Sequence, residues 1–76
     1  MKQVDVKAEF GRQVRALREE KGWSQEHLAA VVGLDRSYVG GVERGERNIS
    51  IENICKLAAS LDVSPEVMFV WWEKSR

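Results

Sequence analysis

Several absences in this 76-residue sequence exclude whole classes of protein. Cys55 is the only cysteine, so no intrachain disulfide can form, and the chain lacks the ligands that a structural zinc site would need. The longest apolar run, residues 67–72, is far shorter than a membrane span, and the N-terminal residues lack the apolar core of a secretion signal. We therefore expect a cytoplasmic protein with no membrane partner, and we interpret Cys55 as a small buried core residue.

The sequence also lacks an excess of charge of either sign. Twelve Lys and Arg residues balance twelve Asp and Glu residues, and the pI is about 6.6. A basic footprint is the usual sign of nucleic-acid binding, so its absence counts against that function. The objection is not decisive, because contact with phosphate depends on local charge. Any binding to a nucleic acid must therefore depend on a few well-placed residues.

Strand-like alternation is missing as well, and helical patterns fill the chain. They predict helices at 5–21, 25–32, 36–44, 51–61 and 65–73, in one all-α domain over residues 1–76. Four of the five helix starts share one device, in which an N-cap residue has an apolar residue directly before it and another four positions later. The predicted caps are Ser24, Asp35, Ser50 and Ser64. The predicted left-handed residues at helix ends are Gly22, Gly33 and Gly45.

Apolar residues at spacings of three and four give the helices one face that should pack into a common core. The expected members are Phe10, Val14, Leu17, Leu28, Ala29, Val32, Val39, Val42, Ile51, Ile54, Leu57, Ala58 and Leu61.

Residues 25–44 predict two short helices joined by a tight turn, a geometry that suits insertion of the second helix into the major groove of DNA. This helix begins with Arg36 and Ser37, whereas the helices on either side carry Glu at their second position. A helix that carries no Glu at this position suits a polyanionic partner. Gly40 and Gly41 are expected on its outer face, where they permit close approach of the backbone to a groove wall. The alternative is that the glycine pair breaks the helix.

These residues resemble the phage repressor/Cro-like helix-turn-helix family, also called the XRE family. The matching positions run from Ser24-Gln25 through Leu28-Ala29, Gly33-Leu34, Val39 and Val42-Glu43-Arg44-Gly45 to Arg47, and continue through Leu57-Ala58, Leu61 and Val63-Ser64-Pro65. The resemblance covers about residues 9–70 and implies a five-helix domain of the lambda-repressor type, with the helix-turn-helix at its second and third helices. It is strongest to short regulators such as the controller proteins of restriction–modification systems, so we expect a bacterial or phage-encoded protein.

The resemblance implies roles by position. Base edges would face Arg36, Ser37, the Gly41 position and Arg44. Phosphates would be contacted by Gln25, Tyr38, Arg47 and Asn48. Arg18 and Glu43 match a pair that forms a buried, structural salt bridge. Gly40 and Gly41 replace longer polar side chains that are common in the family, so position 41 cannot read a base through a side chain. Arg36 opposite a guanine is the favoured base contact, since its forked guanidinium matches the two acceptors of guanine.

The last predicted helix carries more apolar side chains than one face of a terminal helix can bury. One interpretation is a two-fold dimer interface, which would place two recognition helices one turn of DNA apart. In the other, both tryptophans fold back onto the small core. The interface residues would be Val67, Phe69, Val70, Trp71 and Trp72.

Two functions follow from these patterns. The first is a homodimeric transcriptional regulator that binds a two-fold-related operator in double-stranded DNA. The alternative is a protein-interaction module of the same fold, such as an antitoxin, that uses the aromatic C-terminal helix. No cluster of His, Cys or carboxylate residues suggests an enzyme or a metal site, and we expect neither a cofactor nor a small-molecule effector.

Overall fold

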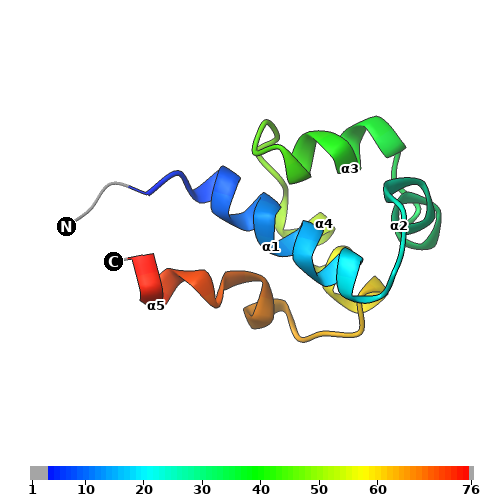
Figure 1. Ribbon diagram of the computed structural model, residues 1–76. Helices are drawn as coiled ribbons and strands as arrows, with labels where there is room; N and C mark the ends of the chain where they lie inside the picture. The colour runs from blue at the N-terminus through cyan, green and yellow to red at the C-terminus, as the bar shows by residue number, and fades with distance from the viewer. Residues whose placement is uncertain (1–3, 76) are drawn as a thin grey trace.

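The structure, a computed structural model, describes residues 4–75. Its elements are α1 (Val6–Glu20), α2 (Gln25–Val32), α3 (Arg36–Glu43), α4 (Ile51–Ser60), the 3-10 helix η1 (Pro65–Phe69) and α5 (Trp71–Ser75). In Figure 1, α3 lies above α1, α2 lies beyond the C-terminal end of α1, and the C-terminal segment (η1 and α5) returns alongside α1. Residues 4–75 contain no strand, and the predicted all-α fold is confirmed.

The first four helices begin and end within one residue of their predicted bounds, and for α2, α3 and α4 the predicted caps form. Ser24 accepts a hydrogen bond from the backbone N–H of His27 at 3.0 Å, and Ser50 accepts one from Asn53 at 3.2 Å. Asp35 accepts from the N–H of Ser37 at a longer 3.5 Å. The apolar residues that precede the four predicted caps all pack against the core, as a hydrophobic staple requires. They are Trp23, Leu34, Ile49 and Val63.

One core unites the helices. Its buried members are Phe10, Val14, Leu28, Ala29, Val39, Val42, Leu57, Ala58, Leu61, Met68 and Trp71. Gly11, which the sequence patterns did not single out, lies where α1 meets the end of α3. A Cβ atom at Gly11 would lie 2.3 Å from the carbonyl oxygen of Val42, so α1 and α3 could not approach this closely with any other residue there.

The predicted helix 65–73 is wrong, because η1 and α5 take its place. The predicted cap at Ser64 is also wrong, since its hydroxyl bonds to the Glu66 carboxylate and no backbone N–H is capped. Met68 lies in η1, and Trp71 is the first residue of α5. The Trp71 indole N–H donates to the Met68 carbonyl at 2.8 Å, and both side chains are buried.

Two residues of α4 lie outside the core to which they were assigned. Cys55 is exposed, because it comes directly after the half-buried Ile54 and a helix turns by about 100° per residue. Ile51 is 79% exposed. Side chains in a helix lean toward its N-terminus, so the side chain of Ile51 in the first turn projects beyond the helix start.

Candidate nucleic-acid interface

The two helices of residues 25–44 are joined by a turn whose backbone is fixed at both ends. Gly33 ends α2 in the left-handed conformation, with φ of 76°, which glycine adopts without steric cost. The N–H groups of Gly33 and Leu34 both bond to the Ala29 carbonyl at 2.9 Å. Asp35 then caps α3. The turn therefore sets the direction in which α3 leaves α2.

The start of α3 is exposed to solvent. Arg36 and Ser37 are both exposed, as their predicted role requires. The Asp35 carboxylate, which could repel an anion here, accepts bonds from the N–H of Ser37 and, at 3.0 Å, from its hydroxyl. The Arg36 guanidinium lies 3.8 Å from the Glu26 carboxylate, a loose pair between exposed side chains.

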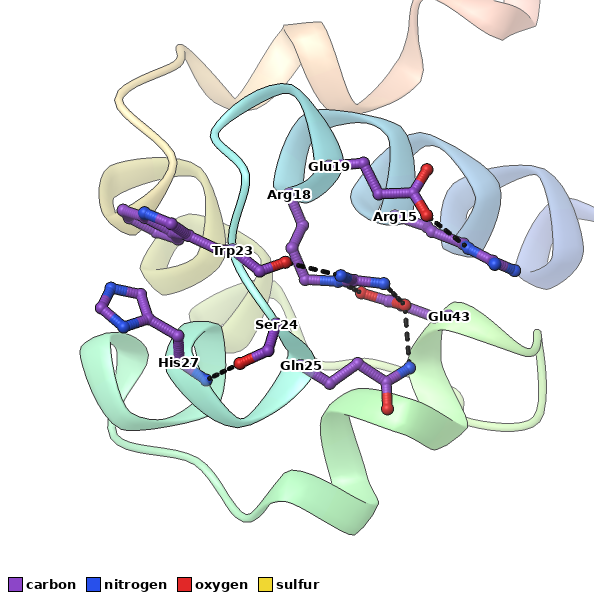
Figure 2. Close-up of polar contacts among 8 residues, drawn as sticks. All are labelled: Arg15, Arg18, Glu19, Trp23, Ser24, Gln25, His27 and Glu43. Atoms are coloured by element: carbon purple, nitrogen blue, oxygen red, sulfur yellow. Dashed lines mark hydrogen bonds and ion pairs between the residues drawn. The ribbon is translucent and has the colours of Figure 1, made fainter.

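The end of α3 is held by a polar network (Figure 2). Two nitrogens of the Arg18 guanidinium donate to the Glu43 carboxylate at 2.7 and 2.9 Å, so the salt bridge that the resemblance implied is present and buried. Arg18 also donates to the Trp23 carbonyl at 2.7 Å, and the Gln25 amide donates to Glu43 at 2.9 Å. The hydrogen bond to Glu43 raises the pKa of Arg18, against the effect of burial. The network ties α1 and the start of α2 to α3.

The outer face of α3 is not bare. The helix continues through Gly40 and Gly41, which rules out a break, yet both residues are buried. A Cβ atom at Gly40 would lie 3.1 Å from Nη1 of Arg44 and 3.4 Å from the amide oxygen of Gln25. At Gly41, a Cβ atom would lie 3.0 Å from Cγ of Arg47. The expectation of an uncovered backbone is therefore wrong in the free protein, where long polar side chains fold over both glycines.

Arg44 is already paired. Its guanidinium donates to both carboxylate oxygens of Glu46, at 3.0 and 3.2 Å. This contact lowers the pKa of Glu46 and raises the pKa of Arg44, first through the hydrogen bond and then through opposite charge. The sequence patterns missed Glu46, because residues two apart do not face each other on a helix. The turn at Gly45, with φ of 78°, brings the two together.

Arg47 and Asn48, two further predicted phosphate contacts, lie in the loop that follows α3, and Tyr38 lies in α3 itself. The Arg47 guanidinium carbon lies 5.4 Å from the centroid of the Tyr38 ring, within range of a cation–π interaction, and Asn48 is exposed. The Tyr38 hydroxyl accepts a hydrogen bond from the amide of Asn53 at 3.2 Å. Asn53 lies fifteen residues further along the chain, and no local pattern could have identified it.

The C-terminal aromatic cluster is divided between core and surface. Trp71 is only 9% exposed, so its assignment to an interface is corrected and it belongs to the core. Phe69, Val70 and Trp72 are 40–51% exposed. Val67 is half-buried, and its carbonyl accepts from the Gln13 amide at 2.9 Å. The exposed apolar side chains of the C-terminal segment are therefore Phe69, Val70 and Trp72.

Within residues 4–75 the structure contains no helix of the length and apolar character that crossing a membrane requires. Among the same residues, no three His, Cys, Asp or Glu side chains are grouped so as to hold a metal ion.

Comparison with known proteins agrees with this geometry. Residues 14–68 match the family HTH_3, described as helix-turn-helix. A hypothetical transcription factor of Neisseria meningitidis serogroup B is 50% identical over 60 residues, which are 79% of this chain but only 57% of that protein.

Solved structures extend the similarity over whole chains. The restriction–modification controller protein C.AhdI from Aeromonas hydrophila is 60% identical, with a TM-score of 0.80 over 82% of this chain and 94% of that one. The controller protein C.Esp1396I, solved as a tetramer in complex with its natural 35 base-pair operator, is 33% identical. Its TM-score is 0.82 over 96% of each chain.

Proposed function

Because the chain belongs to the helix-turn-helix family HTH_3, we propose that it is a transcription regulator that binds double-stranded DNA by sequence, of the restriction–modification controller type. The observation that carries this proposal is the placement of α3. Its first residues are exposed, while its end is fixed by the buried Arg18–Glu43 pair and by Gln25. A helix held in this way can enter a major groove without first being ordered.

The residues divide by role. Arg36 and Ser37 read base edges at the start of α3, and Arg44 joins them after leaving Glu46. Gly41 would reach a base only if Arg47 moved away from it. Phosphates are contacted by Gln25, Tyr38, Arg47 and Asn48. Such contacts fix the register of the protein on the duplex, and the base contacts supply specificity.

The regulator acts as a homodimer on a two-fold-related operator. The dimer places two copies of α3 one turn of DNA apart, roughly 34 Å. Its interface uses the exposed side chains of Phe69, Val70 and Trp72 and the half-buried Val67. The tetramer of C.Esp1396I on its operator supports self-association on DNA in a relative. A regulator that binds such an operator works in the bacterial cytoplasm. The proposed function involves no catalytic step, cofactor or effector.

The test is selection of bound sequences from a random pool of DNA duplexes, combined with a salt titration of binding to unselected duplex DNA. We expect an enriched site with two-fold symmetry, and an affinity that falls steeply with salt because phosphate contacts release counterions. Failure to bind any duplex at low salt would reject the proposal.

The exposed apolar side chains favour the second candidate, a protein-interaction module such as an antitoxin. In that case the chain would bind a partner protein through this surface. Its affinity for duplex DNA would then be weak and without sequence preference.

A further inference from the structure

The side chain of Arg47 occupies the space in which a side chain at position 41 would lie. The three atoms closest to the Cβ position of Gly41 all belong to Arg47: Cγ at 3.0 Å, Nε at 3.1 Å and Cδ at 3.6 Å. Contacts of 3.0–3.4 Å are tighter than nine in ten that real Cβ atoms make. Any residue other than glycine would therefore move the stem of Arg47.

A second group restrains the same arginine. The guanidinium carbon lies 5.4 Å from the Tyr38 ring centroid, and the Tyr38 hydroxyl is bonded to Asn53 of α4. The ring is thus anchored to a neighbouring helix. Gly41 contacts the stem of Arg47 and Tyr38 contacts its head, although Arg47 belongs to a loop and remains exposed overall.

We propose that Gly41 is a positioning residue for Arg47, and that the seat formed by Gly41 and the Tyr38 ring orients this arginine toward DNA phosphate. A glycine inside a helix lowers its stability relative to alanine, so its presence requires a compensating role. Arginine has many rotamers, and restricting them in the free protein lowers the cost of ordering the side chain on binding. This inference rests on the proposed function for its consequence in DNA binding, whereas the seat itself is a property of the free protein.

The seat gives Gly41 a different role from the one that its position first suggested. If the bare backbone of α3 had to approach DNA, a side chain at position 41 would collide with DNA whatever residue stood at position 47. If the seat is what matters, a side chain at position 41 acts only through Arg47. A double-mutant cycle separates the two.

The experiment measures binding to unselected duplex DNA at low salt for the full chain, for Gly41→Leu, for Arg47→Ala and for the double variant. Loss of one phosphate contact lowers affinity by roughly tenfold per subunit and reduces the salt slope by about one. We expect Arg47→Ala to show this loss and Gly41→Leu to approach it. The double variant should bind no more weakly than Arg47→Ala.

Gly40→Ala provides the matched control, because its Cβ atom would meet Arg44 and Gln25 instead of Arg47. Its effect on affinity should persist in the Arg47→Ala background. The thermal midpoint of Gly41→Leu is measured alongside, and a midpoint equal to that of the wild type shows that lost affinity is not lost folding.

Two outcomes would overturn the inference: wild-type affinity in Gly41→Leu, or a loss that is equally large when Arg47 is already absent. A wild-type chain that binds no DNA would reject the proposed function instead, and the seat is then tested by NMR. The Nε proton of the Arg47 guanidinium should be shifted upfield by the Tyr38 ring in the wild type, and Gly41→Leu should abolish the shift. Random-coil shifts in the wild type would show that the seat is not occupied.

Discussion

A single guanidinium at the first position of α3 is where the proposed specificity can be tested most directly. Replacing Arg36 by alanine should relax base preference at one position per half-site, because one bidentate contact to guanine contributes roughly 1–3 kcal/mol of discrimination. Arg15→Ala is the matched control, since Arg15 is equally exposed and is also paired with a glutamate, but it lies on α1. Selection from a random duplex pool measures both. Unchanged preference in Arg36→Ala would remove this residue from base readout.

The buried charge pair predicts a large effect on stability. Glu43→Ala leaves the Arg18 guanidinium buried without its carboxylate, which should lower the free energy of unfolding by roughly 3–5 kcal/mol. Glu19→Ala removes the partner of Arg15 at an exposed site and should lower the free energy of unfolding by about 0–0.5 kcal/mol. Urea unfolding of the two variants compares them. Equal effects would mean that the buried network contributes little to stability.

The ion pair between Arg44 and Glu46 predicts a lowered pKa for the Glu46 carboxylate. Its hydrogen bond holds the pKa of Glu46 below the ordinary value of 4.5. The pair therefore stabilises the folded protein fully above pH 4.5. The contribution is lost as the pH falls through the lowered pKa in the folded protein. NMR titration of the Glu46 side chain should give a midpoint below 4.5, and Arg44→Ala should raise it toward 4.5. A midpoint that Arg44→Ala leaves in place would show that the two side chains are not paired in solution.

At the scale of the elements, two serines that look alike in the sequence differ in the structure. Ser50 caps α4, so Ser50→Ala should lower the free energy of unfolding by about 1 kcal/mol. The Ser64 hydroxyl bonds to the exposed Glu66 side chain and caps no backbone N–H, so Ser64→Ala should lower the free energy of unfolding by less than about 0.5 kcal/mol. Chemical unfolding of both variants measures the difference. A larger loss in Ser64→Ala would indicate that this hydroxyl caps the backbone after all.

The sequence is informative about elements wherever local rules decide them. Caps, staples and glycine ends depend on residues within one turn of each other, and they predicted four helices within one residue of their ends. They were wrong at Ser64, whose hydroxyl bonds to the Glu66 carboxylate and caps no backbone N–H. Gly11 escaped notice because only its contact with the carbonyl of Val42, thirty-one positions away, requires a glycine.

The candidate site, too, could be predicted from the sequence only in part. Arg36 and Ser37 could be placed at an exposed helix start from the pattern alone. The cover over Gly41 could not be predicted, because it depends on the path of the loop that carries Arg47 and on the Tyr38 ring. The cover over Gly40 comes partly from Gln25 of α2, which lies fifteen positions away. Periodicity assigns a residue to one face of a helix, but it does not say which side chain from elsewhere in the chain folds over that face.

At the scale of the whole molecule, the balanced charge restricts how DNA can be bound. With no net positive charge, long-range attraction to DNA is weak, and one subunit offers few cationic contacts. A second copy doubles those contacts without changing the sequence. The exposed apolar surface is therefore as important to the proposed function as the recognition helix is.

A charge on the C-terminal surface should separate the subunits. Val70→Glu places a carboxylate at a side chain that is 51% exposed, so the fold of the monomer should survive. An unpaired carboxylate within a dimer interface should raise the dissociation constant of the dimer by at least about tenfold. Analytical ultracentrifugation measures that constant, and binding to a selected two-fold site should weaken in parallel.

Val31→Glu is the control, because this valine of α2 is similarly exposed, at 47%, and lies outside the proposed interface. It adds the same charge to the chain and should leave the dimer intact. If both variants dissociate alike, net charge and not the C-terminal surface governs association. If the wild type is monomeric at every concentration, Phe69, Val70 and Trp72 must bind a different partner. That result would favour the hypothesis of a protein-interaction module.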